Sequence, residues 1–529
     1  MTFFTFLLPL LFALTGLACG LQRWQAHSAK IALWGVRIAP VILVLSLISW
    51  IFQAPSHFAL AKDAPVNGTM LNALMLILVV FMAWVLVQFS QNYMAGSQRV
   101  THYYRWLMLT LSAVTLTLTS NHLLAFWAGW MGISLGLHFL LTYYPDRHRA
   151  IIAAHKKFIL ARVAEISLLT AFWLLSQAHG SWYISTIMAQ MSEPLTWQEQ
   201  VAAVLIAVAA LMKCAQLPVH GWLMQVVEAP TPVSALLHAG IINLGGYLVL
   251  TFYPLLHLSA VAIWLLLIIA GLTTLISALI MTTRISVKVR LAWSTSAQMG
   301  LMLLECALGL YELAVLHLLT HSVYKAHAFL NSSSAVQEFL KRKLAPDESP
   351  NHITWVAAAV FSFVSVSLAI WLWGYEGPMS PWWLFGFALI ILVAQGRSVP
   401  RPASLARLAG VSVGLALLYG GLKTVTGWLL QNSLEGHAAT HTVAAYSAPD
   451  LWACALFIAL VGLAICLRYY AHLPWVRQFS TALFAGFYLD EWFTKVTLKI
   501  WPVHLPAHSK VKHQSNKFGL TKLPKKWKK

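Results

Sequence analysis

Residues 212–246 read MKCAQLPVHGWLMQVVEAPTPVSALLHAGIINLGG, a largely apolar stretch that contains ionisable residues and prolines. Lys213 lies inside a hydrophobic segment, where a charged side chain is expensive and is seldom retained for packing alone. Pro218, shortly after it, removes a backbone donor and frees carbonyls that only a protein interior or a water-filled cavity can satisfy. Ionisable groups beside interrupted helices are typical of ion paths, so this stretch predicts an ion-moving membrane protein.

The composition of the whole chain also predicts a polytopic membrane protein. Its 529 residues are 59% hydrophobic and only 10% charged, which is too apolar for a surface that faces water. Apolar runs of the length needed to cross a bilayer recur about fifteen times, which predicts an all-α fold of about 15 transmembrane helices. The first run, 3–18, is followed by Arg23 and Lys30 rather than by a cleavage-like site, so we expect it to be retained.

The distribution of positive charge indicates orientation in a membrane rather than nucleic-acid binding. The formal net charge is +19. Basic residues gather in alternate loops, whereas the intervening loops contain almost none, and 177–198 has no lysine or arginine. By the positive-inside rule, this alternation predicts a membrane protein whose N-terminus lies outside the cell and whose C-terminus lies in the cytoplasm.

The part of the chain after Ser480 has a different character. Its central residues mix aromatic side chains with Asp490, Glu491, Lys495 and Lys499, a pattern typical of an amphipathic helix that lies at the membrane interface. The lysine-rich tail, 510–529, predicts either an anchor near anionic membrane lipid or a dock for an acidic cytoplasmic partner. The five cysteines are scattered, so we expect no metal site and no cofactor in this chain.

Several polar residues inside other spans are candidates for an ion path. Arg162 and Glu165 lie on neighbouring positions of one helix and form either a static ion pair or a switchable partner for Lys213. Lys213 itself is either a proton carrier, because burial disfavours its charged form, or a structurally paired lysine. His238 lies in the helix predicted to restart at Pro232, where it either carries protons or only hydrogen-bonds a neighbouring helix.

A second group of candidates repeats every four residues. His317, His321 and Lys325 therefore lie on one face of a helix, over about 12 Å, and this arrangement predicts a proton wire. The competing interpretation is a zinc site, because histidines at positions i and i+4 can share a zinc ion, but the sequence places no third ligand nearby. His327 lies off that face and is expected to be a packing residue.

These motifs together resemble the antiporter-like, proton-translocating membrane subunits shared by respiratory complex I (subunit L) and the multi-subunit Mrp antiporters. The sequence KCAQLP at 213–218 is similar to the lysine-bearing broken helix of that family. PTPVSALLHA at 230–239 matches its most recognisable motif, and Glu228 resembles the acidic residue that often precedes it. RVAE at 162–165 resembles its Arg-x-x-acid pair, and HLLTHSVYKAHAFL at 317–330 resembles its second broken helix.

The resemblance implies two inverted five-helix repeats, each with one broken helix, and a polar axis of lysines and histidines near the midplane. It divides the chain into N-terminal transmembrane helices (1–120), an antiporter-like core (121–430), a C-terminal transmembrane helix (431–480) and an interfacial amphipathic helix with a basic cytoplasmic tail (481–529). One departure is Met131, which stands where the family carries a glutamate that pairs with the lysine of the broken helix. Lys213 is then expected to pair with Glu165, with Glu228 or with a partner chain.

The variant motif at 228–243 is most similar to the membrane subunit of the two-component DAB inorganic-carbon transporters. That resemblance implies a transporter subunit, not an enzyme, which moves a cation, expected to be the proton, to drive CO2 or bicarbonate uptake. It also implies a large cytoplasmic DabA-like partner that resembles a zinc β-carbonic anhydrase and holds the zinc. The alternatives are a proton- or sodium-translocating subunit of a respiratory NADH dehydrogenase-like or antiporter complex, and a membrane scaffold that only anchors its partner.

Overall fold

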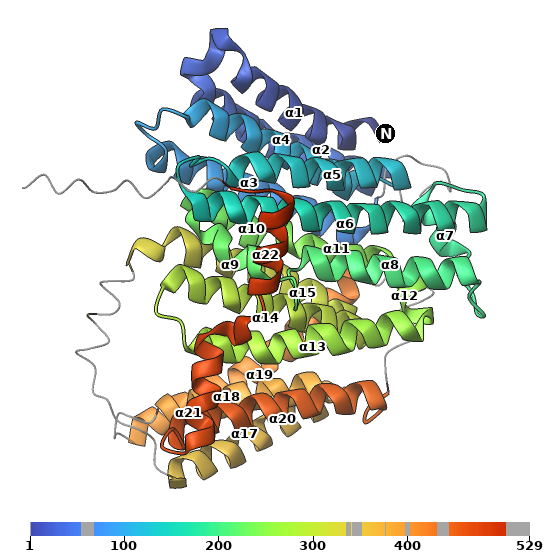
Figure 1. Cartoon of the computed structure of the whole chain (residues 1–529). Helices are drawn as coiled ribbons and strands as arrows, with labels where there is room; N and C mark the ends of the chain where they lie inside the picture. The colour runs from blue at the N-terminus through green and yellow to red at the C-terminus, as the bar shows by residue number, and fades with distance from the viewer. Residues whose placement is uncertain are drawn as a thin grey trace, which may run out of the picture.

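The computed structural model describes residues 2–53, 68–334, 340, 352–375, 377–396, 402–430 and 444–503. Within these ranges the chain is helical, and the only strand-like pairing is an isolated bridge between His122 and Tyr183. The all-α prediction is therefore confirmed. The long helices lie roughly parallel to one another and form one broad bundle (Figure 1).

The bounds of the helices in the described ranges are as follows: α1 (Thr2–Gly20), α2 (Ser28–Gln53), α3 (Met70–Tyr93), α4 (Val100–Thr119), α5 (Leu123–Leu141), α6 (His148–His179), α7 (Ile184–Ala189), α8 (Trp197–Lys213), α9 (Gly221–Gln225), α10 (Thr231–Ala239), α11 (Leu244–Thr251), α12 (Tyr253–Leu258), α13 (Ala260–Thr282), α14 (Val287–Ala307), α15 (Tyr311–Leu330), α17 (His352–Leu372), α18 (Ser380–Gly396), α19 (Pro402–Leu430), α20 (Ala448–Tyr469), α21 (Pro474–Phe484) and α22 (Glu491–Ile500). Short 3₁₀ turns include η1 (Gln22–His27), η2 (Val226–Glu228), η3 (Ile241–Asn243), η4 (Ser332–Ser334) and η6 (Gly486–Tyr488).

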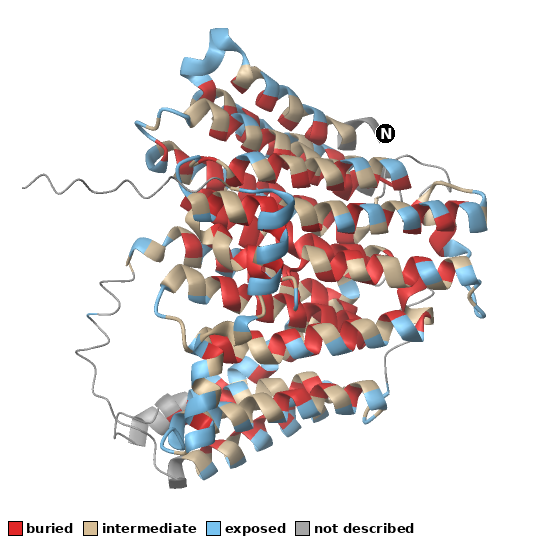
Figure 2. Ribbon diagram, viewed as in Figure 1, coloured by how far each residue is buried: buried red, intermediate tan, exposed pale blue. Residues whose placement is uncertain are grey.

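The helices have the length and the surface of membrane spans. Nine of those in the described ranges are long and apolar enough to cross a bilayer. Buried residues gather inside the bundle, and many outward-facing residues are exposed (Figure 2). Some of these exposed side chains are large and apolar, such as Phe363 and Trp371, as expected where the solvent is lipid. The chain is a multi-pass membrane protein, and the expected number of about fifteen spans stays a prediction.

Two long helices, α13 and α14, pack closely and hold the middle of the bundle together. At Gly300, an added Cβ would lie 2.5 Å from Thr274 Oγ1 and 2.6 Å from the carbonyl oxygen of Ala270. Thr274 Oγ1 also hydrogen-bonds the carbonyl of Ala297 across the same contact, at 3.2 Å. Small residues allow this approach, as they do at many helix–helix contacts in membranes.

We expect Gly300→Ala to destabilise the protein by about 1–3 kcal/mol, because the new methyl group has to displace backbone atoms of α13. The measurement is the thermal unfolding midpoint of the detergent-solubilised chain. The matched control is Gly414→Ala in α19, where an added Cβ meets no atom within 4 Å. An equal loss of stability in both variants would contradict the prediction.

The predicted interruption after Lys213 is confirmed, because α8 ends at that residue and α9 begins only at Gly221. The expectation that 317–330 forms a second broken helix is wrong, since α15 runs without interruption from Tyr311 to Leu330. The physical reason is local: Pro218 interrupts the first segment, whereas α15 contains neither proline nor glycine. The inverted symmetry of two repeats stays a prediction.

The C-terminal segment, defined here as α21 to α22, runs across the direction of the long helices (Figure 1). Each of its two helices has one buried and one exposed face: Leu483 and Phe493 are buried, whereas Phe484 and Trp492 are exposed. The predicted amphipathic helix is therefore present, and its position at the membrane interface stays a prediction. The basic tail predicted at 510–529 lies outside the described residues.

Candidate functional site

Side chains of neighbouring helices hydrogen-bond the backbone of the break between α8 and α9. The amide of Leu217 donates to Thr273 Oγ1 of α13 at 3.1 Å. The carbonyl of Ala215 accepts from Ser296 Oγ of α14 at 3.2 Å. Ala215 itself has a positive φ of 50°, which is uncommon for a residue other than glycine. Backbone groups freed by the break are thus satisfied inside the protein, as a broken transmembrane helix requires.

Lys213 ends α8 with its ammonium group over the face of Trp130 in α5, 4.3 Å from the ring centroid. Such a contact is favourable because the ring face attracts a cation. Trp130 directly precedes Met131, the residue that stands where the resemblance predicts a glutamate. None of the ion pairs within the described part of the chain includes Lys213. The lysine is therefore held by an aromatic face rather than by a fixed acid.

A small cavity lies next to this lysine. Its lining includes Ser134, Lys157, Glu165, Lys213 and Trp222, and its volume is about 30 Å³. A buried water needs roughly 10–15 Å³ of such space and two or more polar partners. The cavity can therefore hold about two waters between the lysines and the carboxylate.

The predicted Arg162–Glu165 pair forms within α6, with a separation of 2.8 Å. Arg162 also donates to Ser134 Oγ at 2.9 Å. Glu165 is buried and lines the cavity that Lys213 also lines. The structure thus brings Arg162, Glu165 and Lys213 together, and adds Lys157, whose Nζ donates to the carbonyl of Ser134 at 2.6 Å.

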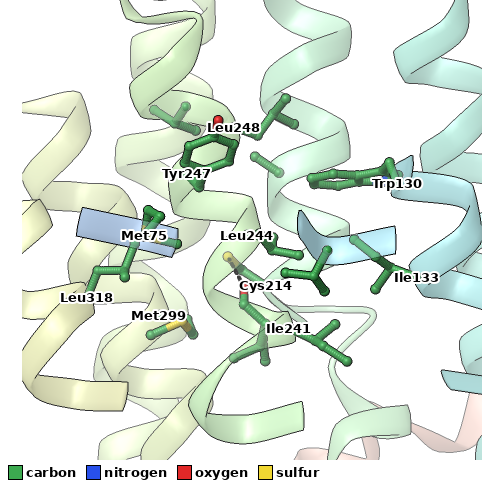
Figure 3. Close-up of a cluster of buried hydrophobic side chains, with 14 of the residues drawn as sticks. Met75, Trp130, Ile133, Cys214, Ile241, Leu244, Tyr247, Leu248, Met299 and Leu318 are labelled. Atoms are coloured by element: carbon green, nitrogen blue, oxygen red, sulfur yellow. Dashed lines mark hydrogen bonds between the residues drawn. The ribbon is translucent and has the colours of Figure 1, made fainter. Parts of the chain in front are cut away.

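Apolar side chains surround the break on its inner side. Figure 3 shows Trp130, Ile133, Ile241, Leu244 and Met299 around Cys214, whose thiol donates to the carbonyl of Ile242 at 3.4 Å. Apolar surroundings of this kind strengthen electrostatic interactions between the groups that they enclose.

His238 of α10 lies on the other side of the break. Its ring is fully buried and stacks on Phe329 of α15 with 4.4 Å between centroids. Its Nδ1 hydrogen-bonds Thr295 Oγ1 of α14 at 3.2 Å. Its Nε2 has no partner within the described residues. The neighbouring residue Ser296 contacts the break, so α14 connects His238 with the region of Lys213.

The face of α15 that carries His317, His321 and Lys325 is confirmed, and its two ends contact α14. At one end, His317 Nδ1 lies 3.0 Å from Glu305 Oε2 and its Nε2 lies 2.8 Å from Gln298 Oε1. At the other end, Lys325 Nζ donates to the carbonyl of Leu291 at 3.0 Å. His321 lies between them, buried, with neither ring nitrogen hydrogen-bonded to a described residue.

One candidate is not brought into this arrangement. Glu228 ends η2, and its partly exposed carboxylate lies 4.0 Å from exposed Arg147. It does not line the cavity beside Lys213. Of the partners suggested for Lys213, the structure places Glu165 nearby and leaves Glu228 outside the buried group.

The sequence analysis missed Glu305, Gln298 and Lys157. Glu305 lies in an apolar part of α14, MGLMLLECALGL at 299–310, and an acid in such a place is a functional candidate by default. That signal was sufficient to find it. Gln298 and Lys157 carry no comparable signal, because one is an uncharged residue and the other is among basic residues near the start of a span.

Comparisons with known proteins identify the relatives of this chain. The family model described as NADH:quinone oxidoreductase/Mrp antiporter, TM, matches residues 120–372. The chain is 46% identical over 510 residues to the probable inorganic carbon transporter subunit DabB of Hydrogenovibrio crunogenus, with 96% of each chain covered. It is 35% identical to the probable subunit DabB2 of Halothiobacillus neapolitanus, over 84% of this chain and 81% of that one.

A solved structure shares the fold. The match is to a chain of the Mrp complex from Dietzia sp. DQ12-45-1b, with a TM-score of 0.62 and 20% sequence identity. It covers 93% of this chain and 60% of that chain. The likeness is one of architecture, and the helices that carry Lys213, His238 and Lys325 lie within the region that the family model matches.

Proposed function

Because the chain belongs to the family of DabB inorganic carbon transporter subunits, within the wider NADH:quinone oxidoreductase/Mrp antiporter membrane family, we propose that it is the cation-translocating subunit of an inorganic-carbon uptake complex. The observation that carries this proposal is the series of buried or half-buried ionisable residues from Glu165 and Lys213 to His317 and Glu305. Buried charge of this kind inside a membrane protein is costly and is retained for function. The cation is expected to be the proton, because every group in the series can hold one.

The two halves of the path have separate roles in this proposal. Lys213 binds a proton beside the small cavity, and Glu165 is the carboxylate whose interaction with Arg162 can be exchanged for one with Lys213. His238, His321 and Lys325 then form the inner part of the path along α14. His317 with Glu305 forms its far end, since both ring nitrogens of His317 meet oxygen acceptors.

The proposed arrangement in the cell follows from the basic loops and from the family. The C-terminal segment faces the cytoplasm of a bacterial inner membrane, and the N-terminus faces the periplasm. The partner is a large cytoplasmic DabA-like protein that resembles a zinc β-carbonic anhydrase. CO2 hydration takes place in that partner, and this chain provides the driving cation flow without a cofactor of its own.

Dissipating the cation gradient is expected to collapse inorganic-carbon accumulation in cells that express the complex. At −100 mV, one inward charge yields about 2.3 kcal/mol, enough for roughly a 50-fold gradient of a neutral species. The measurement is accumulated radiolabelled inorganic carbon with a protonophore or with a sodium ionophore. Accumulation that persists after both gradients are dissipated would contradict the proposed function, and loss with only one ionophore identifies the cation.

A further inference from the structure

Asp490 of the C-terminal segment reaches into the bundle beside the broken helix. Its Oδ2 accepts from Lys156 Nζ of α6 at 2.6 Å and from Gln225 Nε2 of α9 at 3.0 Å. The side chain of Lys156 is fully buried, whereas that of Asp490 is 26% exposed. Asp490 therefore connects a buried lysine with the surface of the bundle.

The carboxylate of Asp490 fits against α9 because the residue it meets there, Gly221, has no side chain. A Cβ at Gly221, the first residue of α9, would overlap the carboxylate of Asp490. The other end of α22 is also fixed, because the ring of Trp501 stacks on that of His155 in α6 with 3.9 Å between centroids. The C-terminal segment thus holds Asp490 from two sides, next to the break that ends at α9.

Several polar atoms around Asp490 are buried and unpaired. Asp490 Oδ1, Gln225 Oε1, His220 Nδ1 and Trp222 Nε1 have no hydrogen-bond partner among the described residues. Buried polar atoms are almost always paired, so a group of unpaired ones marks a place that takes up a small polar ligand. Donors and acceptors both occur here, which suits a water molecule that can pass a proton to the Asp490 carboxylate.

Neighbouring residues of α6 and α9 connect the group around Asp490 with the cavity beside Lys213. Lys156 and Lys157 are neighbours on α6, and Lys157 lines that cavity. Gly221 and Trp222 are neighbours on α9, and Trp222 lines the same cavity. Burial raises the pKa of the Asp490 carboxyl, against the opposing influence of Lys156, so the carboxyl is suited to bind and release a proton.

We propose that Asp490, Lys156 and His220 form a further proton-binding site, through which the cation reaches the cavity beside Lys213 from the side of the C-terminal segment. This inference rests on the proposed function, because it assigns the access point of the same path. The other interpretation is that Asp490 and Lys156 form a static ion pair that only fixes the C-terminal segment.

The two interpretations differ in a double variant. Removing one partner of a buried ion pair is strongly destabilising, whereas replacing both is often neutral. We therefore compare Asp490→Asn, Lys156→Met and the double variant in the full complex. The measurements are ionophore-sensitive carbon uptake, the amount of chain in the membrane and the thermal unfolding midpoint of the purified complex. Glu491→Gln, an exposed neighbouring acid, is the matched control.

We expect Asp490→Asn to lower uptake at least about tenfold, in line with the loss of one proton-transfer group. In the double variant, the unfolding midpoint returns to that of the unmodified complex while uptake stays low. Uptake that recovers in the double variant, or that is normal in Asp490→Asn, would overturn the inference in favour of a static pair. If ionophores have no effect on uptake by the unmodified complex, the proposed function fails and this inference fails with it. If ionophores abolish uptake by the unmodified complex while Asp490→Asn leaves uptake unchanged, only this inference fails.

Discussion

Lys213→Ala is expected to reduce carbon uptake to the level of cells that lack this chain, while the protein still inserts and assembles. The lysine is the ionisable group at the break, and the cavity beside it has room for water through which its proton can be exchanged. Its main contact is a cation–π interaction with Trp130, which is worth about 0.5–2 kcal/mol. The loss of that contact is small beside the stability of a large bundle, so the effect on function should exceed the effect on folding.

Lys213→Arg separates positive charge from proton release. A guanidinium group keeps the contact with the face of Trp130 but does not release a proton near neutral pH. We expect this variant to assemble and to be as inactive as Lys213→Ala. The control for Lys213→Ala is Lys30→Ala, which removes a lysine charge at an exposed position. Full uptake by either well-assembled Lys213 variant would remove this residue from the mechanism.

The elements that local sequence rules describe were predicted correctly. Pro218 predicted the break after Lys213, because proline removes a backbone donor wherever it lies. The four-residue spacing of His317, His321 and Lys325 placed them on one face of a helix. The expected second break at 317–330 came from family resemblance and not from a local signal, and the continuous α15 contradicts it.

The contacts between distant segments were beyond the reach of the sequence. His317 meets Glu305 and Gln298 only because α14 packs against α15. Asp490 lies 334 residues from Lys156 in the chain, and no spacing rule connects them. Glu228 is near the correct motif but outside the buried group, because η2 leaves it beside exposed Arg147. Which charges share a cavity depends on the packing of whole helices.

The second large effect that we expect is the loss of carbon uptake when the proposed zinc-containing partner is absent. If the complex hydrates CO2, its zinc needs a set of clustered ligands, typically cysteine, histidine and a carboxylate. In this chain, Cys19 belongs to α1, Cys214 follows α8, and Cys306 belongs to α14, and all three are buried and free. Within the described ranges no three histidine, cysteine or acidic residues lie close enough to hold a metal ion. The proposed function places the zinc in a second polypeptide.

Purification through an affinity tag on this chain is expected to bring down a large soluble protein with about one zinc ion per copy. Deleting the partner's gene should abolish carbon uptake as completely as deleting this chain, because cation flow without hydration leaves nothing to drive. Metal analysis of this chain alone is expected to show no stoichiometric zinc. The control is the Lys213→Ala chain, which should still bring down the zinc protein, since its defect lies in the ion path. A fully active, zinc-loaded complex that contains only this polypeptide would contradict both the partner and the proposed function.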